Sequence, residues 1–245
     1  MMRESKLRTW VSMDNSDPQL EDTQRRTGSK TLDNGIHVLR ILAQHPDGLP
    51  MTLIAREIGV HRTVAYRLLV SLTRARLCEQ RANGKYVIGL GVLELARGVR
   101  SGLHEVARPF LRDLAEKTYA TAFLAVIDGG EIVCTAVAEP LRDGIYVSYR
   151  VGQRHDTTKG ADGMAALAGG LALADERPEI TAARERGYVV SRGEVQSGAW
   201  GLATWIVQPS GEVVSIGIIS VGDRNGETLA PQVRSTARLI SERLA

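Results

Sequence analysis

Three helical segments follow a polar N-terminal stretch. Residues 1–28 have few periodic apolar positions, which is typical of a flexible tail. The first helical segment has apolar residues at spacings of three or four, namely Leu32, Ile36, Leu39 and Leu42. Ser29 is a suitable N-cap for it, and the helix is expected to end at the sequence His45-Pro46-Asp47-Gly48, because proline disfavours helical geometry in the residue before it.

The second helix is expected to be short and the third one long, with a tight turn between them. Thr52 is a suitable N-cap for a helix over residues 53–58, which Gly59 would end. After Gly59 and Val60, a longer helix is expected from about residue 61 to residue 75. The apolar ridge of this longer helix consists of Val64, Leu68 and Leu72, widened by Ala65 and Leu69.

The period then changes to that of strands. β-type residues at 77–78 and 86–88 flank the dipeptide Asn83-Gly84, which is a strong hairpin signal because both residues tolerate positive φ. Helical spacing returns over residues 90–99. The order helix, short helix, tight turn, long helix and hairpin is that of a winged helix-turn-helix over residues 29–90.

The remaining chain alternates helices with grouped strands. We expect strands over 121–127, 132–138, 145–151, 202–207 and 213–221, and helices over 103–115, 162–174, 179–186 and 231–244. This order indicates an α+β domain with a mainly antiparallel sheet flanked by helices.

Charge is distributed unevenly between the two regions. Residues 28–100 contain eleven basic and five acidic residues, whereas residues 101–245 contain fifteen basic and eighteen acidic ones. Arginine, hydroxyl and aromatic side chains on one helix suit base edges and phosphates, so the basic region is expected to bind double-stranded DNA. The candidate DNA-binding residues are Arg56, His61, Arg62, Thr63, Tyr66, Arg67, Ser71, Arg81 and Lys85. For Arg67, a role in anchoring the fold against the hairpin remains the alternative.

The sequence resembles the IclR-type transcriptional regulators. The resemblance rests on residues 61–80 (HRTVAYRLLVSLTRARLCEQ) and 84–96 (GKYVIGLGVLELA), and continues more loosely through residues 151–168, 183–190 and 193–203. It implies a linker helix over residues 91–102 and a GAF-like effector-binding domain over residues 103–245. It also implies a homodimer or a dimer of dimers, with promoter binding controlled by a small-molecule effector.

The expected effector pocket lies between one sheet face and the loops before Met164 and around Trp200. Where the family has a histidine and a small hydroxyl residue, this sequence has Thr158 and Gly160, and a common cysteine is replaced by Gly201. These departures count against a carboxylate effector typical of the family and favour a pocket that is smaller, more apolar or not used. The expected effector is a small organic acid or an apolar metabolite. The candidate effector-binding residues are Thr158, Gly160, Met164, Trp200, Gly201 and Thr204. For Met164 and Trp200, ordinary core packing is the competing interpretation.

Composition and missing motifs exclude other classes. With 43% apolar and 24% charged residues the chain is globular, and its longest uncharged apolar run, residues 163–174, is too short to cross a bilayer. We expect no membrane contact, no secretory signal, buried thiols at Cys78 and Cys134, and a cytoplasmic location. No nucleophile elbow, phosphate loop or zinc motif is present, so no enzyme, catalytic residue, metal or cofactor is expected. His155 and Asp156 are interpreted as a surface pair.

The sequence therefore predicts a DNA-binding transcriptional regulator under the control of a small molecule. The alternative is a ligand-sensing oligomeric protein in which the helical N-terminal block serves dimerisation and not DNA binding. An enzyme with an undetected active site is a weaker third option.

Overall fold

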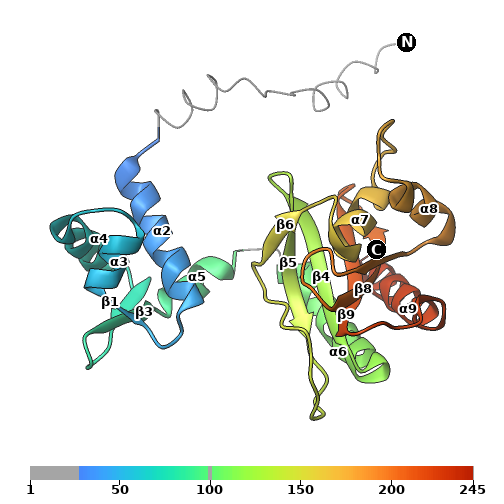
Figure 1. Cartoon of the computed structure of the whole chain (residues 1–245), viewed down its shortest axis with the longest axis horizontal. Coiled ribbons are helices and arrows are strands. Elements are labelled where there is room, and N and C mark those ends of the chain that lie inside the picture. The colour runs from blue at the N-terminus through green and yellow to red at the C-terminus, as the bar shows by residue number, and fades with distance from the viewer. Residues whose placement is uncertain (1–27, 99–100, 245) are drawn as a thin grey trace. The chain divides into compact units, whose positions relative to one another are not determined.

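The computed structural model describes residues 28–98 and 101–244. The chain divides between residues 99 and 100 into two compact units. Figure 1 shows the helices and strands of each unit. The tail expected over residues 1–28 lies outside the described residues except for Gly28. None of the described helices is long and apolar enough to cross a membrane.

The first unit has the order of a winged helix-turn-helix. Its elements are α2 (Lys30–Gln44), β1 (Leu49–Pro50), α3 (Met51–Glu57), α4 (Arg62–Arg74), β2 (Cys78–Gln80), β3 (Lys85–Ile88) and α5 (Gly91–Ala96). The three short strands pair antiparallel in the order β1-β3-β2. A small core joins the helices to this sheet, and its fully buried residues include Val38, Leu42, Ile54 and Leu69.

Two local predictions for these helices are corrected. Leu32 and Ile36 are 62% and 41% exposed, because α2 turns Gly35, Val38 and Leu42 toward the core instead. Val64 of α4 is exposed as well. Thr52 is not the N-cap of α3. Pro50, the last residue of the strand β1 that pairs with β3, holds that position, and its side chain makes no capping hydrogen bond.

The hairpin between β2 and β3 closes with a turn in which only the glycine has positive φ. The N–H of Gly84 donates to the carbonyl of Arg81 (2.9 Å), and Gly84 has a φ of +77°. Asn83 does not adopt positive φ. Instead its side-chain oxygen accepts from the N–H of Lys85 (3.1 Å). The loop is therefore a turn followed by a left-handed glycine, a common longer hairpin connection.

The second unit is a six-stranded antiparallel sheet with helices on both faces. Its strands run in the order β6-β5-β4-β9-β8-β7. They are β4 (Thr121–Asp128), β5 (Glu131–Ala138), β6 (Arg154–Asp156), β7 (Val189–Arg192), β8 (Ala199–Val207) and β9 (Val213–Val221). The helices are α6 (Ser101–Thr118), α7 (Gly160–Gly169), α8 (Pro178–Arg186) and α9 (Gly226–Leu244). The expected α+β fold with a mainly antiparallel sheet is confirmed.

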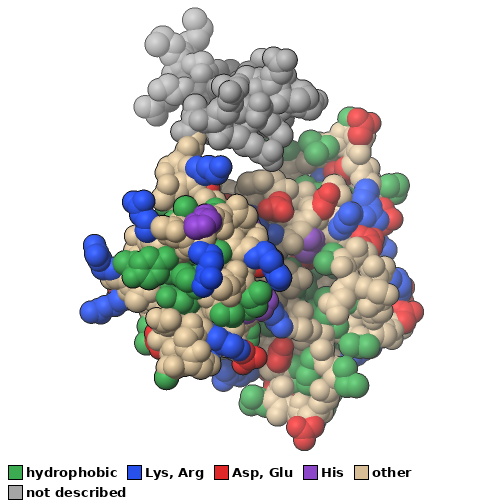
Figure 2. All heavy atoms as spheres, turned by 60° about the vertical axis from the view of Figure 1, so that its left-hand side comes forward, with side chains coloured by type: hydrophobic (Ala, Val, Ile, Leu, Met, Phe, Trp, Pro, Cys, Tyr) green, Lys and Arg blue, Asp and Glu red, His purple; other side chains and the backbone are tan. Residues whose placement is uncertain are grey.

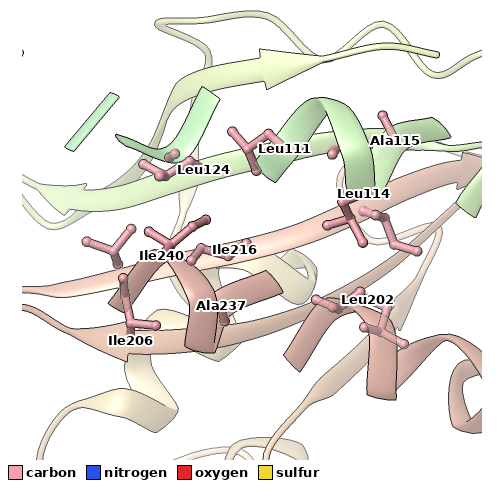
Figure 3. Close-up of a cluster of buried hydrophobic side chains, with 14 of the residues drawn as sticks. Leu111, Leu114, Ala115, Leu124, Leu202, Ile206, Ile216, Ala237 and Ile240 are labelled. Carbon is pink, nitrogen blue, oxygen red and sulfur yellow. The ribbon is translucent and has the colours of Figure 1, made fainter. Parts of the chain in front are cut away.

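The two faces of the sheet bury separate apolar clusters. On one face α6 and α9 cover a cluster that includes Leu111, Leu124, Ile216 and Ile240 (Figure 3). On the other face α7 and α8 cover Phe123, Met164, Ile180 and their neighbours. Central strands are therefore buried on both sides, which explains why β4, β8 and β9 have long apolar runs with little alternation.

Other boundaries differ from the predictions. Residues 145–151 form no strand: Val147 and Tyr149 are buried, but Ile145 and Val151 are exposed. The hydroxyl of Thr121 donates to the carbonyl of Val147 (3.1 Å). Strand β7 was not predicted, and α7 ends at Gly169 rather than Ala174. Helix α9 begins five residues before Pro231, because the Asn225 side chain accepts from the N–H of Thr228 (3.2 Å) near its start.

Replacing Leu124 by alanine tests the buried cluster under α6 and α9. Leu124 is fully buried on β4 opposite Ile216, so we expect Leu124→Ala to lower the free energy of unfolding of this unit by about 2–5 kcal/mol. Denaturant titration followed by circular dichroism measures it. Leu141→Ala removes the same atoms from a side chain that is 82% exposed and is expected to change stability by less than about 0.5 kcal/mol. Equal losses in the two variants would contradict this description of the core.

Candidate nucleic-acid interface and ligand pocket

A closed turn between α3 and α4 sets the direction of α4. The N–H of Val60 donates to the carbonyl of Ala55 (3.0 Å), and the N–H of Gly59 donates to Arg56 (3.1 Å). Ile54 and Ile58 on one side and Leu68 and Leu69 on the other are buried in the same cluster. This packing fixes one face of α4 and leaves the opposite face to solvent.

The exposed face of α4 carries most of the candidate DNA-binding side chains. Arg62, Thr63, Tyr66 and Arg67 are all exposed, with Tyr66 at 54%. The first turn contains no acidic residue, so the positive end of the helix dipole is not offset locally. His61 is the N-cap, and its Nδ1 accepts from the N–H of Thr63 (3.3 Å), so this histidine orders the start of the helix.

The remaining candidates flank this face. The hydroxyl of Ser71 donates to the carbonyl of Arg67 (3.1 Å) within α4. Arg56 is exposed near Glu57 (3.6 Å). Arg81 and the half-buried Lys85 lie at the two ends of the hairpin loop, where their backbones are hydrogen-bonded to each other (2.9 Å). Figure 2, which shows one side of the molecule as spheres, has many Lys and Arg side chains at the surface.

A small hollow with a cavity volume of about 40 Å³ opens in the second unit between the start of α7, one face of the sheet and the segment 193–196. Its lining combines apolar side chains with a few polar groups, as the linings of ligand sites do. Aromatic packing forms part of its wall, since Phe123 and Tyr149 meet edge to face with ring centroids 5.3 Å apart. The lining includes Phe123, Val147, Ser148, Tyr149, Gln153, His155, Gly160, Ala161, Asp162, Ser191, Glu194, Val195, Gln196, Gly201 and Ile219.

The structure places two of the six candidate effector-binding residues at this hollow, Gly160 and Gly201. Met164 is fully buried in the core beneath α7, and Trp200 is buried in the cluster on the opposite face of the sheet. Thr158 is exposed and hydrogen-bonded to Asp156 (2.7 Å). The hydroxyl of Thr204 donates to the carbonyl of Gly187 (2.7 Å), away from the hollow.

A buried carboxylate forms one wall of the hollow. Asp162 lies in the first turn of α7, and its Oδ2 accepts a hydrogen bond from the hydroxyl of Tyr149. The Nε2 of His155 lies 3.0 Å from the same oxygen. The expectation that His155 and Asp156 form a surface pair is wrong, because His155 points inward and its side chain is only 11% exposed. A charged residue in the otherwise apolar sequence of α7 was the signal for such partners.

Asp162 shifts the titration of both of its partners. Burial raises the pKa of Tyr149, and the charge and hydrogen bond of Asp162 raise it further. Burial lowers the pKa of His155, but the hydrogen bond and charge of Asp162, with a contribution from Asp156, more than offset this effect. The net pKa of His155 is therefore above its ordinary value. The described residues contain no group of three or more His, Cys, Asp or Glu that could hold a metal ion.

A second carboxylate, that of Glu194, lies at the start of α7. Its Oε2 accepts from the N–H of Gly160 (2.9 Å), and Arg177 donates to both of its oxygens (3.1 Å each). Hydrogen bonds from Arg177 to Glu194 and then to Glu179 raise the pKa of the arginine. Gly160 itself has a φ of +74°, and a Cβ there would lie 2.6 Å from Asp162 Oδ1, so the site requires glycine.

The pKa of His155 predicts how stability depends on pH. Because this pKa is higher in the folded chain, protonation of His155 stabilises the fold below the unfolded value of about 6.5. That stabilisation is lost as the pH rises through the folded value. We expect the melting temperature of the wild type to fall as the pH rises above about 6.5, and His155→Gln to remove this part of the slope. The exposed His37 gives the control, His37→Gln, and equal slopes in the wild type and His155→Gln would contradict the expectation.

Known proteins match the first unit in sequence and the described chain in fold. Residues 31–82 match the sequence model of the IclR helix-turn-helix domain. The HTH-type transcriptional regulator Rv1719 of Mycobacterium tuberculosis is 31% identical over 110 residues, which are 44% of this chain and 42% of the relative. The chain thus matches less than half of the length of this relative.

Solved structures extend the likeness to both units. An IclR transcriptional regulator from Alicyclobacillus acidocaldarius is 21% identical with a TM-score of 0.73, covering 89% of this chain and all of the other. An IclR homologue from Microbacterium hydrocarbonoxydans, crystallised with 4-hydroxybenzoate, is 20% identical with a TM-score of 0.74, covering 88% and 99%. These likenesses show the fold. Residues 31–82 thus match the IclR helix-turn-helix domain in sequence, and the described chain shares the fold of these solved structures.

Proposed function

We propose that this chain is a transcriptional regulator that binds double-stranded DNA and whose promoter binding is modulated by a small molecule. The observation that carries the proposal is the division of α4 into a buried face and an exposed face. Leu68 and Leu69 lock the helix into the core, whereas Arg62, Tyr66 and Arg67 face solvent. A rigidly held helix with this exposed chemistry suits the major groove.

The elements around α4 suit the phosphate backbone. Backbone N–H groups at a helix start favour anions, and α4 begins with no acidic side chain in its first turn. Arg81 and Lys85 at the hairpin loop add positive charge beside it. In this proposal residues 29–90 contact DNA, and residues 91–102 connect them to an effector domain at 103–245. Helix α5 covers the first half of that connection.

The hollow in the second unit supports control by a small molecule. It has the mixed apolar and polar lining of a ligand site, and a protein of the same fold was crystallised with 4-hydroxybenzoate. Two DNA-binding units of a homodimer, or of a dimer of dimers, would contact two half-sites in the cytoplasm. The ligand would change their relative placement, with a coupling free energy of about 1–3 kcal/mol. This function involves no catalysis and no membrane.

One observation favours a second function for the helical unit. Leu32 and Ile36 on α2 and Leu90, Leu93 and Leu95 around α5 are exposed. Such apolar surface suits a contact between subunits. If dimerisation were the sole role of this unit, the chain would be a ligand-sensing oligomer without DNA binding.

A titration of the purified full chain on DNA separates the two functions. It uses the promoter fragment of its own gene and an unrelated fragment of equal length, at two salt concentrations. A regulator binds its own fragment more tightly at both. Equal binding that disappears at the higher salt would show only a basic patch and would favour the ligand-sensing oligomer.

Replacing residues on the exposed face of α4 tests base recognition. We expect Arg62→Ala and Tyr66→Ala to reduce the ratio of specific to non-specific affinity, with a loss of about 1–3 kcal/mol on the specific site. Competition binding between the two fragments measures this ratio. An unchanged ratio in both variants would contradict a role of α4 in base recognition.

Replacing Lys85 tests the phosphate contact of the hairpin. We expect Lys85→Ala to weaken binding to both fragments alike and to reduce the slope of log affinity against log salt by about 1. The exposed Arg238 on α9 of the other unit gives the matched control, because Arg238→Ala removes the same charge. If Arg238→Ala changed the salt slope as much as Lys85→Ala, the hairpin would have no special role.

A further inference from the structure

The hollow in the second unit is lined by two carboxylates and one histidine, and by no lysine or arginine of the described residues. Asp162 and Glu194 both contribute to its wall, whereas Arg177, which neutralises Glu194, lies behind that glutamate and is not part of the lining. A ligand in the hollow therefore contacts acidic and neutral groups only, apart from His155.

Glu194 already holds the position that suits an anion. The start of α7 points its N–H groups and the positive end of its dipole at this wall, and the Glu194 carboxylate accepts from the N–H of Gly160 (2.9 Å). Arg177 fixes the carboxylate with two hydrogen bonds and also donates to the carbonyl of Thr158 (2.8 Å). A carboxylate that accepts three hydrogen bonds from two residues is not easily displaced.

The other carboxylate is satisfied from within the protein as well. Oδ2 of Asp162 accepts from the hydroxyl of Tyr149 and lies 3.0 Å from Nε2 of His155. A cationic ligand therefore finds both carboxylates already paired. The rest of the wall is apolar or neutral, with the side chains of Phe123, Val147, Val195, Ile219, Gln153, Gln196, Ser148 and Ser191.

We propose that the hollow binds an uncharged small molecule with an apolar body and a hydroxyl or similar neutral polar group, and that Glu194 excludes carboxylates from it. An anion would have to lose its hydration beside two carboxylates with no free cation to pair with. The apolar wall holds the body of the ligand, and the glutamine and serine side chains hydrogen-bond its polar group. This inference rests on the proposed function, because it specifies the ligand of that sensor.

Three probes with the same ring but different charge test the inference. Calorimetric titration of the full chain with benzyl alcohol, benzoate and benzylamine is expected to give the tightest binding for benzyl alcohol, by about tenfold or more over each charged probe. Gly201→Val places side-chain atoms against Ala161 and Ser191 in the hollow and is expected to weaken benzyl alcohol binding, which locates the probe.

A charge-removing variant tests the role of Glu194. Glu194→Gln keeps the size of the side chain but removes one of the two carboxylates that line the hollow and leaves Arg177 with Glu179 as its carboxylate partner, so we expect benzoate affinity to rise by about tenfold and benzyl alcohol affinity to change little. The matched control is Glu179→Gln. Glu179 pairs with the same Arg177 (3.1 Å) but does not line the hollow, and its loss is expected to leave the order of the probes unchanged.

Three results would overturn the inference: benzoate or benzylamine binding the wild type as tightly as benzyl alcohol, the two glutamine variants behaving alike, or none of the probes binding. A DNA titration on the same preparations keeps the two proposals apart. Failure of probe selectivity with site-restricted DNA binding intact would leave the regulator standing. Loss of DNA binding with probe selectivity intact would remove the regulator and leave the ligand class.

Discussion

Burial of both faces of the six-stranded sheet is the constraint on which the second unit depends. The central strands β4, β8 and β9 carry apolar residues on both sides, so each face needs a helical cover. Helices α6 and α9 supply one cover through amphipathic stripes. Helix α7, which is apolar on nearly all sides, supplies the other and is buried almost throughout.

Burial of α7 explains the polar groups that line the hollow in the second unit. The helix brings Asp162 into the interior, and a buried carboxylate is costly unless it is paired and hydrogen-bonded. Tyr149 and His155, from a loop and an edge strand, supply these partners. The N–H of Gly160 at the start of the same helix donates to the carboxylate of Glu194. The hollow thus lies where the packing of an apolar helix requires polar partners.

The helical unit follows the same logic on a smaller scale. Its core fixes one face of α4 and one face of α2, and the side chains on the opposite faces of these helices are exposed. On α4 that face is basic and polar, whereas on α2 it includes Leu32 and Ile36. One small core therefore presents two surfaces of different chemistry.

Local patterns in the sequence were sufficient for the helix-turn-helix, the hairpin and the antiparallel class of the sheet. Helical spacing, the Ser29 cap and the Asn83-Gly84 dipeptide depend on neighbouring residues, and the structure retains each as an element. Three predictions were wrong: the buried face of α2, the start of α3 and a strand over residues 145–151. Each of these features depends on which distant segment lies alongside.

The predictions for the hollow in the second unit divide in the same way. The residue pattern predicts a pocket near the start of α7, and Gly160 and Gly201 do line the hollow there. That Trp200 belongs to the opposite sheet face, and that His155 and Tyr149 contact Asp162 while Glu194 contacts Gly160, follows from the three-dimensional packing. The physical reason is that partners 7 to 34 residues apart are brought together by sheet register and helix packing, which leave no local periodicity in the sequence.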